Sequence, residues 1–115
     1  MKIEEHMKKA KGIENSTAKL DEEEDWQLIV EGVYGAALHY IAAICEKKIG
    51  KHLETHKGLP GFLDENGLSE LATLFRQLDS FRVSRWYGKQ GDGETVRLAR
   101  EILERIKGEA HETRG

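Results

Sequence analysis

Cysteine and proline are nearly absent from this chain of 115 residues, which contains one of each. The single cysteine, Cys45, cannot form an intrachain disulfide, so the chain does not resemble the small secreted proteins that disulfides stabilise. Long alternations of apolar and polar residues are also missing, which argues against a β-sheet protein. Charged residues make up 34% of the sequence, and this share together with the scarce proline suits a helical protein.

An excess of positive charge is missing too, because 18 Lys and Arg residues stand against 21 Asp and Glu and the formal net charge is −3. This balance excludes a strongly cationic protein of the histone or ribosomal kind, while it allows a local basic patch. Residues 1–5 lack the apolar core of a signal peptide. The longest apolar stretch, 36–45, is interrupted by His39 and is too short to span a bilayer. We therefore expect a cytoplasmic protein that does not cross a membrane.

Apolar residues recur at helical spacing in four segments, which predicts an all-α protein. The segments run over residues 3–20, 25–48, 69–87 and 94–107. Because most of the links between them are short, we predict one antiparallel up-down four-helix bundle. The sequence indicates a single domain over residues 1–108, followed by a flexible tail over residues 109–115.

The segment over residues 25–48 is apolar around much of its surface. Such a helix should lie centrally and contact neighbours on more than one side. Gly32 and Gly35 would let a neighbouring helix approach closely, which is also consistent with a dimer. The connection over residues 51–66 carries two glycine-containing turn signals. We expect it to be a loop that two apolar side chains anchor on the bundle, Phe62 and Leu63.

Several short motifs, taken in their order and spacing, resemble proteins of the HEPN family over nearly the whole chain. The second segment reads Val-Tyr-Gly-Ala-Ala-Leu-His-Tyr over residues 33–40. His-Lys-Gly follows at residues 56–58, and the third segment ends with Arg82 and, five residues later, Tyr87 and Gly88. The resemblance implies a homodimer with the Arg82 motif beside the dimer cleft. It also implies a possible partner protein, a small nucleotidyltransferase.

Some HEPN relatives are metal-independent RNases of toxin–antitoxin systems, whose motif is an Arg, usually a polar residue, and a His a few residues further on. This chain departs from that motif twice, because Val83 follows Arg82 and Tyr87 stands where the His could be. An imidazole titrates near neutral pH and suits proton transfer, whereas a phenol with a pKa of about 10 does not. A guanidinium stays charged and still binds phosphate oxygens. The substitutions therefore favour binding over catalysis.

From these observations we expect a HEPN-type module that dimerises and binds a nucleotide, RNA or a nucleotidyltransferase partner, without strong catalysis and without a cofactor. Arg82, Arg85 and Tyr87 are the candidate nucleotide- or phosphate-binding residues. The alternative is an RNase toxin with a divergent active site, whose candidate catalytic residues are Arg82, Tyr87 and His39. A third and lesser alternative is a purely structural interaction protein.

Two histidines, His52 and His56, are four positions apart, which is the spacing of metal ligands on one helix face. Gly50 is expected to break the helix before them, and no convincing third ligand follows. We therefore predict no metal site. Cys45 is expected to be a small buried hydrophobic residue. His39 is interpreted either as a nucleotide contact or as a buried histidine with a hydrogen-bond partner.

Overall fold

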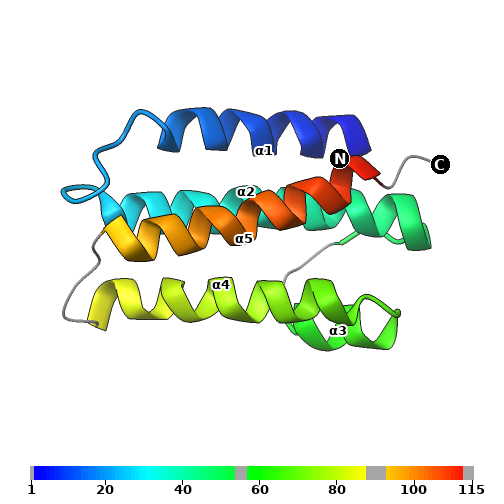
Figure 1. Cartoon of the computed structure of the whole chain (residues 1–115). Helices are drawn as coiled ribbons and strands as arrows, with labels where there is room; N and C mark the ends of the chain where they lie inside the picture. Colours follow the sequence, from blue (N-terminus) through cyan, green and yellow to red (C-terminus); the bar gives the residue numbers. More distant parts are fainter. Residues whose placement is uncertain (1, 54–56, 88–92, 113–115) are drawn as a thin grey trace.

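The computed structural model describes residues 2–53, 57–87 and 93–112, without the side chains of residues 83–87. These residues form five helices (Figure 1): α1 (Ile3–Thr17), α2 (Trp26–Ile49), α3 (Leu59–Glu65), α4 (Ser69–Tyr87) and α5 (Gly93–Glu112). No strand occurs in the described part of the chain, so the all-α prediction is confirmed.

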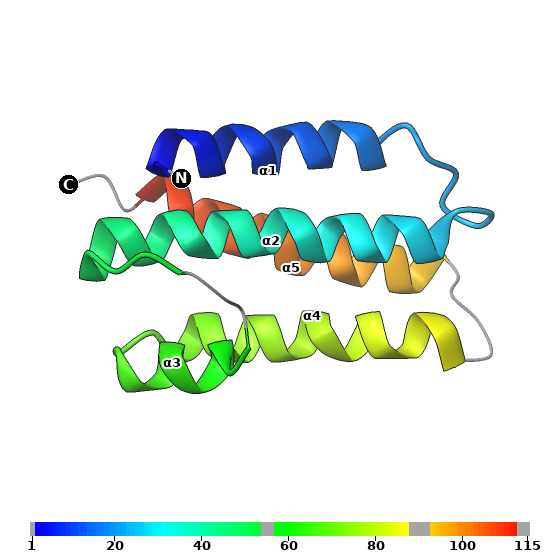
Figure 2. The same ribbon diagram turned by 180° about the vertical axis from the view of Figure 1, so that it is seen from behind.

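Helix α2 lies at the centre of the molecule and contacts α1, α4 and α5. Figures 1 and 2 show α1 on one side of the α2–α5 pair and α4 on the other, and α1 and α4 do not contact each other in the described residues. The four long helices run in alternating directions along the chain (Figure 1). The short α3 packs against α4.

The long helices begin close to their expected positions, and the ends of α1 and α5 differ more. Helix α1 ends at Thr17 rather than at residue 20. Helix α5 continues to Glu112, so the flexible tail expected over residues 109–115 is helical as far as that residue. Ala110 is fully buried, and its carbonyl accepts a hydrogen bond of 2.9 Å from the Lys47 ammonium. These contacts extend α5 past Gly108.

The connection expected to be a loop contains α3, which the sequence analysis missed. Gly58 precedes α3 in the left-handed conformation (φ 72°), and Pro60 lies in the first turn, where a missing amide N–H breaks no helical hydrogen bond. Leu59 and Leu63 are buried on one face, and Phe62 packs against the core. The anchoring role expected for Phe62 and Leu63 is therefore confirmed.

The hydrophobic core is built around α2, of whose 24 residues 12 are buried. Cys45 is fully buried, as expected, and burial raises the pKa of its thiol to about 11, which keeps the sulfur protonated and unreactive. By length and mean hydropathy (1.6), α2 also passes a test for a membrane-spanning helix. Because 67% of the tested window is buried in the fold, and core helices pass the same test, this is weak evidence for a membrane.

Helix α1 approaches α2 most closely at Gly32. A Cβ atom at Gly32 would overlap the Thr17 methyl group of α1, whereas a Cβ atom at Gly35 would lie 3.8 Å from Ile13 Cδ1, an ordinary contact. The close neighbour that the sequence predicts for these glycines is thus α1 of the same chain. The glycines therefore add no support to the dimer prediction.

Candidate functional site

Arg82, on α4, contacts Tyr34, which belongs to the α2 motif over residues 33–40. The Arg82 Cζ atom lies 4.4 Å from the centre of the Tyr34 ring, a cation–π arrangement. Arg82 Nε donates to Glu31 Oε2 at 3.3 Å, and an Arg82 terminal nitrogen lies 3.8 Å from Asp79 Oδ1. The Arg82 side chain is 35% exposed. The site therefore presents an oriented guanidinium that solvent can reach.

Two carboxylates compete with any anionic ligand for Arg82. Glu31 comes from α2, one turn before Tyr34, and Asp79 comes from α4, one turn before Arg82. Burial raises the pKa of Tyr34, and the nearby Asp79 raises it further, so the phenol stays protonated. Phosphate binding at Arg82 therefore requires that the phosphate displaces a carboxylate or shares the guanidinium with it.

Arg85 and Tyr87 belong to the last turns of α4, but their side chains lie outside the described residues. His56, the second histidine of the rejected metal pair, also lies outside them. That Arg85 and Tyr87 join Arg82 in one phosphate site thus stays a prediction.

His39 does not lie beside Arg82 within one chain. Its Nδ1 atom is 3.0 Å from Nδ1 of His6, on α1. Arg82 lies on α4, on the other side of α2 (Figure 1). Burial lowers the pKa of His39, and the positive charge of Lys9 lowers it further. In this fold His39 is thus a partly buried histidine with a hydrogen-bond partner, and its role as a nucleotide contact or in catalysis stays a prediction.

A cluster of histidines that the sequence analysis missed surrounds the contact between His6 and His39. His6 is buried, and its ring centre lies 5.3 Å from that of His39 and 6.2 Å from that of His52. His52 Nδ1 lies 2.8 Å from Glu46 Oε1. One signal was available in the sequence, because His6 precedes the apolar Ala10 by four residues and so shares its helix face.

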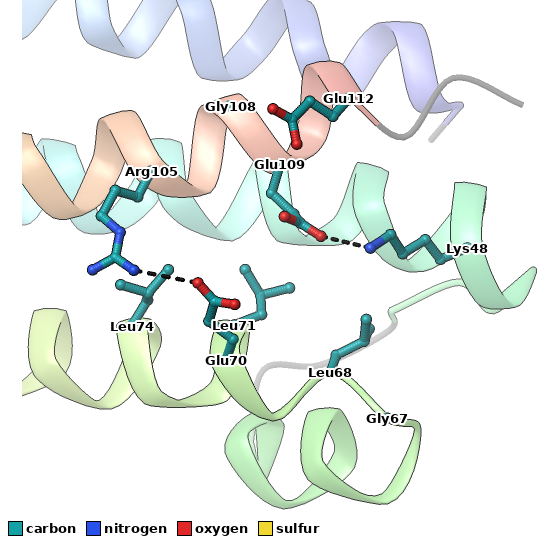
Figure 3. A pocket seen from close by; sticks show the side chains of 10 residues that line it. All are labelled: Lys48, Gly67, Leu68, Glu70, Leu71, Leu74, Arg105, Gly108, Glu109 and Glu112. Carbon is teal, nitrogen blue, oxygen red and sulfur yellow. Dashed lines mark hydrogen bonds and ion pairs between the residues drawn. The ribbon is translucent and has the colours of Figure 1, made fainter.

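A separate cavity of about 470 Å³ lies between α4, α5 and the end of α2 (Figure 3). Its cationic side chains are already paired, Lys48 with Glu109 at 2.5 Å and Arg105 with Glu70 at 3.2 Å. None of the candidate residues from the sequence lines it. Because both cationic side chains of the wall are paired with carboxylates of the same wall, the cavity offers no comparable anion contact.

No protein-family model, curated protein or solved structure matches this chain. The fold and the described contacts define an all-α protein in which Arg82 pairs with Glu31 and lies over the ring of Tyr34. The HEPN resemblance rests on the sequence motifs, and what it implies about function is therefore a proposal.

Proposed function

We propose that this chain is a HEPN-type module, an antiparallel up-down bundle of four long helices that forms a homodimer and binds a nucleotide or RNA through Arg82. The observation that carries the proposal is the contact between Arg82 and Tyr34. It joins the Arg82 motif of α4 to the α2 motif over residues 33–40, and the resemblance depends on both. A small nucleotidyltransferase is the protein partner that the resemblance implies, and the cytoplasm is the expected location.

The arrangement around Arg82 suits phosphate recognition. A guanidinium forks onto two phosphate oxygens and keeps its charge at any physiological pH. Stacking on Tyr34 and pairing with Glu31 restrict the Arg82 side chain before a ligand arrives, so less conformational freedom is lost on binding. When phosphate binds, it takes the place of the Glu31 carboxylate, which then turns to solvent.

We expect Arg82→Ala to weaken binding of a short RNA or a nucleotide at least tenfold, since a charge-assisted hydrogen bond contributes about 1.5–3 kcal/mol. Glu31→Gln is expected to strengthen binding severalfold, because it removes a competing carboxylate. Fluorescence anisotropy with labelled RNA, at one fixed salt concentration, measures both effects. The matched control is Arg76→Ala, which removes another arginine of α4 that pairs with a carboxylate, Asp64, at 2.6 Å.

Equal losses in Arg82→Ala and Arg76→Ala would show that any binding is non-specific attraction to positive charge. The same proteins separate binding from catalysis. RNA cleavage in the presence of a chelator that disappears with Arg82→Ala would favour the RNase toxin, with Tyr87 as the remaining candidate for proton transfer on α4. Neither binding nor cleavage, across several RNAs and nucleotides, would leave a purely structural interaction protein.

We expect Leu28→Glu to weaken the homodimer at least tenfold. Leu28 is the one large hydrophobic side chain in the described residues that is exposed, at 60%. It lies one helical turn before Glu31 on α2 and therefore near the Arg82 contact, where the resemblance places the dimer cleft. A charge on an apolar interface residue loses its solvation when the interface forms. Sedimentation velocity over a range of protein concentrations measures the effect.

The control for Leu28→Glu is Thr73→Glu, which adds the same charge at an exposed position of α4. A dimer that Thr73→Glu and Leu28→Glu weaken equally would contradict an interface at Leu28. A wild-type chain that stays monomeric at every concentration would contradict the homodimer itself.

A further inference from the structure

Two imidazoles and a carboxylate meet at the end of the molecule where α1 begins and α2 ends (Figures 1 and 2). His6 of α1, Glu46 of α2 and His52, just after α2, each place one ligand atom within 4.8 Å of the other two. We propose that these three residues bind a divalent transition-metal ion of the zinc class.

The donor set fits this class of ion. Two histidine nitrogens and one glutamate oxygen form a set of three protein ligands that Zn²⁺ uses when its fourth position is left to water or a substrate. Bonds of about 2.0–2.2 Å in a tetrahedral arrangement place ligand atoms roughly 3.4 Å apart, and the three ligand atoms already lie within 4.8 Å of one another. The pair of His52 Nδ1 and Glu46 Oε1, now at 2.8 Å, must move apart slightly to admit the ion. The His52 side chain, 46% exposed, has room to make that movement by rotation.

His6 supplies an independent observation, because its Nε2 atom is buried and has no hydrogen-bond partner. Buried polar atoms normally have a hydrogen-bond partner, so a buried nitrogen without one requires an explanation. His6 Nδ1 already contacts His39 Nδ1 at 3.0 Å. When Nδ1–H donates to His39, Nε2 carries a free lone pair, and metal-bound histidines commonly use their second nitrogen in this way.

His39 lies beside this site without belonging to it. Its Nδ1 atom contacts His6 Nδ1 at 3.0 Å, and it is not among the three residues whose ligand atoms converge. His39 is thus placed as a positioning residue, which holds the His6 ring and its tautomer.

The local fold explains how ligands from three segments converge. Gly50 ends α2 in the left-handed conformation (φ 64°), and the chain then turns so that His52 returns to the Glu46 side chain. The helix break at Gly50, which argued against His52 and His56 as a pair of ligands, therefore brings His52 to Glu46 instead. A bound metal would tie the first turns of α1 to the end of α2.

The test is a titration of the folded chain, prepared without a polyhistidine tag, with ZnCl₂ by calorimetry and with Co²⁺ by visible absorption. We expect one ion per chain and the intense d–d bands of four-coordinate Co²⁺. His52→Ala and Glu46→Gln are each expected to weaken Zn²⁺ binding more than tenfold, since even outer-shell changes cost 10–100-fold. Both residues are partly exposed, so these variants should fold, which circular dichroism without metal verifies.

His111→Ala is the matched control, because His111 is an exposed histidine on α5, outside the cluster. It should bind Zn²⁺ as the wild type does. Equal affinity in the wild type, His52→Ala and Glu46→Gln would overturn the proposal, and so would the absence of binding at 100-fold excess of metal over protein. In a thermal melt, Zn²⁺ should raise the midpoint of the wild type and of His111→Ala but not that of His52→Ala. Equal shifts in all three would count against the site.

Discussion

Replacing Glu14 by alanine is expected to lower the free energy of unfolding by about 2–3 kcal/mol. Glu14 connects three helices. From α1, its carboxylate accepts a hydrogen bond from the Tyr40 hydroxyl of α2 and pairs with Lys107 of α5 at 3.4 Å. The Glu14 and Lys107 side chains are only 13% and 19% exposed. Without the carboxylate, the phenol loses its acceptor and the ammonium retains the more distant Glu104 carboxylate at 4.0 Å, in a place where water replaces the lost group poorly.

The network makes ordered predictions for related variants, which chemical denaturation followed by circular dichroism can measure. Tyr40→Phe removes one donor and keeps the ion pair, so it should cost about 1 kcal/mol. Burial raises the pKa of Tyr40, and its hydrogen bond to Glu14 raises it further, which keeps the hydroxyl a donor. The double variant Glu14→Leu with Lys107→Met removes both charges and should recover most of the loss, because a pair replaced by apolar groups leaves no unpaired charge.

Glu70→Ala is the matched control for Glu14→Ala. It breaks an ion pair with Arg105 in which the side chains are 81% and 63% exposed, and exposed pairs contribute about 0–1 kcal/mol. If Glu14→Ala and Glu70→Ala cost the same, the idea that Glu14 fastens α1 to the bundle is wrong.

The sequence predicted the long helices well because their amphipathic periodicity is a local property. Helix α4 runs over the predicted residues. The periodicity did not find α3, since seven residues make fewer than two turns and show no repeat. It also placed the end of α5 too early, because Gly108 resembles a helix stop. Tertiary contacts extend α5 beyond Gly108, because Ala110 is buried and Lys47 donates a hydrogen bond to its carbonyl. Such contacts override local propensity.

In the candidate sites, too, the sequence predicted local features but not the contacts between distant segments. The motifs singled out Arg82, but its contacts with Tyr34 and Glu31 join segments about fifty positions apart, which no local pattern specifies. The convergence of His6, Glu46 and His52, which we propose as a metal site, depends on the turn at Gly50 and on how α1 lies along α2. Periodicity shows which face of a helix is buried, but it does not show which residue of another helix faces it.

Gly32→Ala is expected to destabilise the protein by about 1–3 kcal/mol, although alanine is the better helix former by about 1 kcal/mol. The cause is the overlap between the new methyl group and the Thr17 methyl on α1. Thr17 cannot easily turn away, because it is buried and its hydroxyl donates to the Glu14 carbonyl at 2.9 Å. A β-branched side chain also has few alternative rotamers. Helix α1 must therefore move outward.

A double-mutant cycle with Thr17→Ser tests this explanation, because the effect of Gly32→Ala on the free energy of unfolding should change sign. Serine keeps the hydroxyl and lacks the methyl group, so Gly32→Ala in that background should stabilise the protein by up to about 1 kcal/mol. Gly35→Ala is the control on the same face of α2. Its Cβ would make an ordinary 3.8 Å contact with Ile13, and it should be stabilising in either background. If Gly32→Ala is equally destabilising with serine and with threonine at position 17, methyl crowding is not what sets the spacing of α1 and α2.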